Sequence, residues 1–373
     1  MKWLLVALVL GLSFSLNAQT KYKHRGSAFK QNKVEAQFMI GRIVKNHPDL
    51  PKNIGYTTIQ SLNFYGKRNK WQWQYLYGSP SLGLSIGSAQ FGNNNTYGNA
   101  YFTMLQMKFG ERVGCVRRLR PHVILGTGLA YHTKQYDYLT NPDNIAISSK
   151  INNVSKAELG AKIYLNQRSF IGVYGGVYHF SNGKASVPNV GINVPYVGAS
   201  LAYIFYKPNS KLAKTDSIIA KDRIRVNGRL GLGFTKSKLP TGPVYHIYTY
   251  QLFASKRLSG KNNVQAGFEV FQHSPTSVLL QHQELSEKSI DATRIVFFAG
   301  HEFYFGHFSF LTQGGIYIDQ SISKPSIFSS RLGFNYYLKS LHNHIGVNPN
   351  IGVAVKSDFG EADFVEISIG CGF

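Results

Sequence analysis

The sequence predicts an all-β protein, an antiparallel transmembrane β-barrel of about 14–16 strands. The chain alternates like a strand through about sixteen segments, separated by turns rich in Gly, Asn, Pro or Lys. One face of a segment is apolar and the other is polar and rich in glycine. In the last segment Ile367 and Ile369 share one face, while Glu366 and Ser368 share the other. Residues 19–373 contain no apolar run of about 18 residues, which excludes a helical membrane protein.

Residues 1–18 are typical of a cleaved secretory signal peptide. Lys2 supplies the positive charge, residues 4–12 the apolar core, and residues 16–18 a cleavage site with a small final residue. A short N-terminal segment, 19–33, follows. An exported barrel that ends on an aromatic residue, here Phe373, is expected in the bacterial outer membrane.

The predicted strands are about 9–14 residues long, which suits strands that cross a membrane at a tilt. In the first half, residues 34–206, they are 34–44, 56–65, 81–91, 98–109, 121–134, 157–165, 169–181 and 194–205. In the second half, residues 223–373, they are 223–235, 245–255, 264–272, 293–304, 308–319, 327–338, 345–355 and 363–373. Residues 207–222 are polar without alternation and are predicted to be a linker. One barrel built from both halves is the first choice, and two eight-stranded units are the alternative.

The net charge of +23 comes from 41 Lys and Arg against 18 Asp and Glu. The basic residues are scattered through turns, so they suit the phosphates of outer-membrane lipid or lipopolysaccharide better than nucleic acid. Nucleic acid is therefore not expected as a partner, and the oligomeric state stays open. Cys115 and Cys371 could pair in an oxidising compartment, but two cysteines are too few for a disulfide framework or a metal site. Neither a metal nor another cofactor is expected.

One strand end and the turn after it carry the candidate chemistry. His179 and Ser181 are two residues apart, so on a strand both side chains leave the same face. A histidine beside a serine can activate the hydroxyl as a nucleophile. Asn182 and Asn189 can offer amide N–H groups to an oxyanion, and Gly183 permits the sharp turn that places them.

The strand 169–181 places this candidate site at the lipid boundary. Its aliphatic face, which ends in His179 and Ser181, is the face expected to meet lipid. Asn193 occupies the corresponding face of the next strand, so it can lie beside both across the hairpin. A catalytic group at this rim would meet a lipid ester rather than a soluble substrate.

The run His179-x-Ser181-Asn182-Gly183, followed by Pro188-Asn189-x-Gly191, resembles the signature of the lipid A 3-O-deacylases (PagL), which are grouped with the acyloxyacyl hydrolases. The resemblance covers about 34–206 and implies an eight-stranded outer-membrane barrel. It implies a serine esterase that removes an ester-linked 3-hydroxyacyl chain from the lipid A of lipopolysaccharide. In that family pattern Ser181 attacks the ester carbonyl and His179 takes its proton. Asn189 and the turn at Asn182 and Gly183 would stabilise the oxyanion.

The chain departs from the family at the third catalytic position, where Asn193 replaces a glutamate. In a serine-protease triad the same exchange of carboxylate for amide costs about 10⁴ in turnover, although Cys-His-Asn proteases work with an amide. Two functions therefore remain open: a deacylase of reduced activity, and a non-enzymatic pore or structural barrel derived from one. The second half, 223–373, lies outside this motif pattern and has no His-x-Ser-Asn run.

Overall fold

The computed structural model describes residues 30–51, 55–68, 71–110, 119–206, 223–236, 242–272, 293–320, 326–338, 347–358 and 361–373. The predicted signal peptide, the predicted linker and Cys115 lie outside these residues. The first strand begins at Lys30, inside the segment 19–33 that was predicted to precede it.

Alternating side chains form sixteen antiparallel strands among the described residues. The first eight are β1 (Lys30–Gly41), β2 (Thr57–Arg68), β3 (Ser81–Gln90), β4 (Asn99–Phe109), β5 (Leu119–His132), β6 (Ile151–Tyr164), β7 (Ser169–Ser181) and β8 (Ile192–Tyr206). The others are β9 (Arg225–Lys236), β10 (Val244–Arg257), β11 (Asn262–Gln272), β12 (Thr293–Phe305), β13 (Phe308–Gln320), β14 (Phe328–Tyr337), β15 (Asn348–Asp358) and β16 (Glu361–Gly372). The all-β antiparallel barrel class is confirmed.

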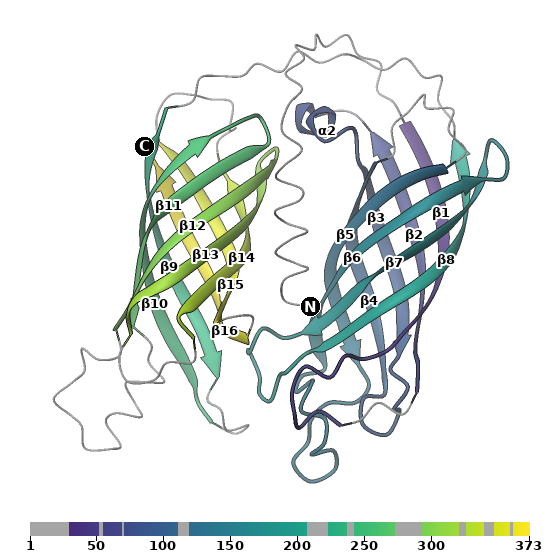
Figure 1. Cartoon of the computed structure of the whole chain (residues 1–373), viewed down its shortest axis with the longest axis horizontal. Coiled ribbons are helices and arrows are strands. Elements are labelled where there is room, and N and C mark those ends of the chain that lie inside the picture. Colours follow the sequence, from purple (N-terminus) through teal and green to yellow (C-terminus); the bar gives the residue numbers. More distant parts are fainter. Residues whose placement is uncertain are drawn as a thin grey trace.

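The strands close into two eight-stranded barrels, one from β1 to β8 and one from β9 to β16 (Figure 1). In the first barrel β1 pairs with β8, with Val34 opposite Tyr203. In the second, β9 pairs with β16, with Leu230 opposite Ile369. The single barrel of 14–16 strands is therefore wrong, and the alternative of two units is confirmed. Because β8 finds its edge partner in β1, neither strand has a free edge left for the second half.

Both barrels turn apolar side chains outward and polar ones inward, as the alternation predicts. In β16, Ile369 is 60% exposed, whereas the neighbouring inward residue Ser368 is 4% exposed. Among the described residues, no helix is long and apolar enough to cross a membrane. The helix α2 (Gln72–Leu76) is a single short turn between β2 and β3.

The two ends of the first barrel differ in the length of their connections. The longest connection, 133–150, lies with 182–191 at the lower end in Figure 1, whereas the shortest, 165–168, lies at the other end. Bacterial outer-membrane barrels have long extracellular loops and short periplasmic turns. Ser181 closes β7 at the long-loop end.

The two barrels lie side by side (Figure 1). Side chains contact each other at both ends of the barrels. At the short-turn end, the rings of Trp73 and Tyr77 pack on Phe305 with centroids 5.7 and 4.7 Å away. At the long-loop end, Lys184 Nζ lies 3.8 Å from the carboxylate of Glu361, the first residue of β16. The turn after Ser181 therefore touches the second barrel.

The interior of each barrel is occupied by buried charged side chains. In the first, Lys108 Nζ lies 2.8 Å from a carboxylate oxygen of Glu35. In the second, Arg331 forms ion pairs with Glu269 and Glu366, and all three are buried. A charge buried away from water is tolerated when an opposite charge pairs with it. The positive and negative side chains of these pairs therefore neutralise each other inside the barrels.

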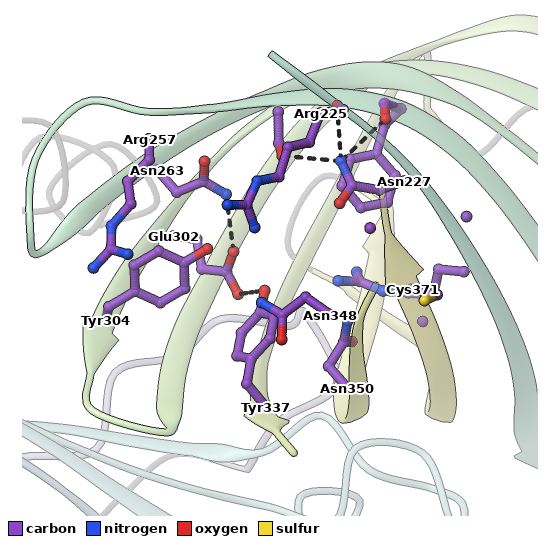
Figure 2. Close-up of a pocket in the computed structure, with 16 residues that line it drawn as sticks. Arg225, Asn227, Arg257, Asn263, Glu302, Tyr304, Tyr337, Asn348, Asn350 and Cys371 are labelled. Carbon is purple, nitrogen blue, oxygen red and sulfur yellow. Dashed lines mark hydrogen bonds between the residues drawn. The ribbon is translucent and has the colours of Figure 1, made fainter. Parts of the chain in front are cut away.

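A small cavity remains in the second barrel around Glu302, which accepts hydrogen bonds from Asn263 and Tyr337 at 3.1 and 2.8 Å (Figure 2). Its volume is about 30 Å³, enough for about two water molecules.

Replacing Arg331 with Met should destabilise the second barrel by about 3–5 kcal/mol, because Glu366 and Glu269 would lose a buried partner. Urea unfolding of the refolded protein in detergent measures this change. Arg223→Met is the matched control, since Arg223 is exposed just before β9 and its replacement should change stability by less than about 0.5 kcal/mol. Equal stabilities for the two variants would show that the ion pairs contribute nothing.

Candidate active site

The end of β7 presents His179 and Ser181 on the outer face of the first barrel. Tyr178 and Phe180, the residues that alternate with them, are fully buried in the interior. Ile171 and Val173 extend the outer row down the strand and are exposed. The structure therefore places both candidate residues where the alternation predicted, at the loop end of an apolar row.

His179 is oriented by Asn193 on the neighbouring strand. The two residues are directly opposite in the β7–β8 pair. His179 Nδ1 and Asn193 Oδ1 are 2.8 Å apart. Because an amide oxygen only accepts, this bond requires the hydrogen on Nδ1, which leaves Nε2 free to accept a proton. Asn193 thus holds the ring of His179 in this orientation through a neutral acceptor.

The hydroxyl of Ser181 lies between two hydrogen-bond donors. Asn189 Nδ2 donates to Ser181 Oγ at 2.9 Å, and the backbone N–H of Gly183 donates to it at 3.1 Å. Asn189 is held in place because its Oδ1 accepts the backbone N–H of Asn182 at 3.2 Å. An amide and a backbone N–H this close to the serine oxygen can also reach the carbonyl oxygen of an ester bonded to that serine, which is where an oxyanion forms.

Two glycines allow the chain to turn this closely around the serine. Gly183 has a φ of +64° and Gly191 a φ of +78°, which other residues rarely adopt. A Cβ on Gly191 would lie 3.0 Å from His179 Cε1 and 3.6 Å from Ser181 Cβ. A side chain at Gly191 would therefore push His179 out of position.

The connection 182–191 is anchored to the connection 133–150. The backbone N–H of Gly191 donates to the carbonyl of Ala146 at 3.1 Å. The amide of Asn182 donates to Ser149 Oγ at 3.0 Å. These bonds hold the donors of the site on a fixed support, although the site lies at a rim.

All the residues that the sequence predicted for the site are brought together. Within the described part of the chain, His179 and Ser181 are not hydrogen-bonded to each other. Ser181 Oγ accepts from Asn189 and Gly183, and its O–H stays available as a donor. Catalytic hydrogen bonds are often loose without substrate and tighten in the complex.

Three polar side chains beside the site were missed. Thr127 of β5 and Asn153 and Ser155 of β6 also point outward. The segment 157–165 was predicted to begin after Asn153 and Ser155, whereas β6 begins at Ile151. The sequence gives no alternation signal for them, because the start of β6 carries Asn152 on the inner face and Asn153 on the outer face.

Fold and site together define the class: a protein of two antiparallel barrels with apolar outer faces, carrying a serine–histidine group on one rim. Residues 224–373 match the family model described as acyloxyacyl hydrolase, C-terminal domain. The second barrel is therefore similar to this domain. The matched residues form the second half of the chain, which lies outside the motif resemblance at 34–206. They contain β9 to β16 in full.

Solved structures with similar barrels have low identity. They include a BenF-like porin from Pseudomonas fluorescens Pf-5 (10% identity, 93% of this chain and 98% of that one, TM-score 0.20). The translocator domain of the autotransporter NalP from Neisseria meningitidis has 11% identity. The match covers 99% of this chain and 94% of that one, with a TM-score of 0.22. Pseudomonas aeruginosa OpdQ has 8% identity, and the match covers 93% of this chain and 97% of that one, with a TM-score of 0.21. These values do not place the chain among porins or autotransporters. No curated protein matches the sequence.

Proposed function

We propose that this protein is an outer-membrane serine esterase that removes an ester-linked acyl chain from the lipid A of lipopolysaccharide. The family whose model matches the second barrel is named for ester hydrolysis. The observation that carries the proposal is the outward-facing pair His179 and Ser181, with donors on the serine oxygen and an orienting amide on the histidine.

The reaction follows from these contacts. Ser181 Oγ attacks the ester carbonyl carbon while Nε2 of His179 takes the hydroxyl proton. The carbonyl oxygen becomes an oxyanion that Asn189 Nδ2 and the N–H of Gly183 stabilise. As the intermediate collapses, the C–O bond to the sugar breaks and His179 returns the proton to the leaving sugar oxygen. Water then attacks the acyl-serine by the same route and releases the fatty acid.

The position of the pair supports a lipid substrate. His179 and Ser181 end a row of apolar residues that would lie against acyl chains, at the long-loop end of the barrel. In outer-membrane barrels this end faces the outside of the cell, where lipopolysaccharide forms the outer leaflet. An ester at the boundary between sugar and acyl chain would meet Ser181 at that depth.

A pore or structural barrel is the second candidate, and Asn193 in place of a carboxylate is the observation that favours it. The buried pairs Glu35–Lys108 and Arg331–Glu366 weigh against the pore, because they occupy barrel interiors. An assay of the purified protein on lipid A in detergent separates the candidates. The esterase releases fatty acid; a structural barrel releases none.

Asn189→Ala should lower the kcat of this reaction by about 10²–10³, the usual cost of an oxyanion donor. The matched control is Asn46→Ala, because Asn46 Nδ2 donates to the Val190 carbonyl of the same connection at 3.1 Å and has no bond to Ser181. The control should retain most of the activity. An equal loss in both variants would assign Asn189 to holding the connection rather than to the oxyanion.

A further inference from the structure

Three polar side chains on the outer face of β5 and β6, Thr127, Asn153 and Ser155, form one hydrogen-bonded group, the outer polar cluster. Asn153 Nδ2 donates to Thr127 Oγ1 at 3.0 Å and to the Gly128 carbonyl at 3.1 Å. Ser155 Oγ donates to Asn153 Oδ1 at 2.8 Å and lies 3.4 Å from Thr127 Oγ1. The side chains are thus held in fixed orientations relative to one another.

The cluster sits on a mostly apolar surface. Its outward neighbours Leu129, Ile151 and Leu159 are 60%, 64% and 65% exposed. Polar groups that face lipid are costly, and those retained there commonly mark a functional site. The internal hydrogen bonds reduce this cost, but Asn153 remains exposed. Apolar residues at these three positions would suit the lipid-facing surface better, so barrel stability does not explain them.

The strand register places the cluster directly beside the candidate active site. Ser155 lies opposite His179, and Asn153 lies opposite Ser181, in the β6–β7 pair. Side chains opposite each other in an antiparallel pair have Cβ atoms about 5 Å apart. A substrate whose ester carbon is at Ser181 therefore covers these residues with the atoms next to the ester.

We propose that the outer polar cluster binds the uncharged polar part of the lipid substrate, the hydroxyl and amide groups next to the ester, and positions the ester over Ser181. This inference rests on the proposed function. An amide and two hydroxyls offer both donors and acceptors without charge, which suits hydroxyl and amide partners better than phosphate. The acyl chain then runs the other way, over Ala157 and Val177, toward the apolar belt.

The test compares two substrates with the full-length protein in detergent micelles. Asn153→Leu and Thr127→Val should each lower kcat/KM for lipid A about tenfold, the order expected for one or two lost hydrogen bonds. Their activity on a p-nitrophenyl fatty-acid ester, which lacks the hydroxyl and amide groups, should be unchanged. Thr127→Ser keeps the hydroxyl and should retain activity on both. Thr58→Val is the control, since Thr58 is an outward residue of β2, a strand that pairs with β1 and β3 and not with β5, β6 or β7.

The outcomes separate this inference from the proposed function. Equal losses on both substrates, or no loss on either, would overturn the positioning role. If the wild type hydrolyses neither substrate, the proposed function fails. Binding of lipid A to Ser181→Ala protein then still tests the cluster. A roughly tenfold weaker binding after adding Asn153→Leu would support it, and unchanged binding would overturn it.

Discussion

Replacing Ser181 or His179 with alanine should each remove nearly all release of 3-hydroxy fatty acid from lipid A, a loss of about 10³-fold or more. Ser181 supplies the attacking oxygen, and His179, oriented through its 2.8 Å bond to Asn193, is the group that can take the proton. When catalytic residues act as one unit, removing either residue already abolishes the activity of the whole unit. The double variant should therefore be little worse than either single variant. The measurement is the rate of fatty-acid release by purified protein in detergent.

Ser169→Ala is the matched control for this experiment. Ser169 begins β7 on the same outward face and lies at the opposite end of the strand from Ser181. Its removal should leave the rate unchanged. Activity that survives Ser181→Ala would place the reaction elsewhere in the molecule.

Asn193→Glu should raise kcat, by about tenfold or more, provided that the new carboxylate reaches Nδ1 of His179. An amide orients the ring but cannot offset the positive charge that forms when His179 takes the serine proton. A carboxylate does both, and its exchange for an amide costs about 10⁴ in a serine-protease triad. Because the pocket has adjusted to an amide, the gain is expected to be smaller than that loss.

Two companion variants make this prediction specific. Asn193→Leu removes the acceptor on Nδ1 and should lower kcat below that of the wild type. The double variant Ser181→Ala with Asn193→Glu should be inactive, because the carboxylate acts only through the histidine and serine. A lower rate for Asn193→Glu than for the wild type would mean that Asn193 is not the third member of the group.

The barrel class could be predicted from sequence because the alternation of side chains has a strict period of two. Ile367 and Ser368 fall on opposite faces whatever strand lies next to them. The positions of the candidate site residues could be predicted for the same reason. His179 and Ser181 share a face by spacing, and Asn193 comes beside them through a hairpin.

Barrel closure could not be predicted in the same way. The contact that closes the first barrel, Val34 with Tyr203, joins strands at opposite ends of that half. Local alternation does not show which edges meet, so one large barrel and two small ones fit the pattern equally. The alternation likewise assigns Arg331 to an interior face, but it does not identify Glu269 and Glu366 as the partners of Arg331.

The outer polar cluster escaped prediction for a different physical reason. Asn152 points inward and Asn153 outward, so the start of β6 is polar on both faces and shows no hydrophobic alternation. Only the register with β7 shows that Asn153 and Ser155 lie opposite Ser181 and His179. A local rule that relies on apolar residues fails at such a place, where polar side chains sit on the lipid face.

The most direct test of the account is mass spectrometry of lipid A from three otherwise identical bacterial strains. One carries the wild-type protein, one the Ser181→Ala variant and one neither. The account predicts that only the wild-type strain contains lipid A lighter by one ester-linked acyl chain, while the other two strains give identical lipid A. Identical lipid A in all three strains, or the same loss with Ser181→Ala as with the wild type, would contradict it.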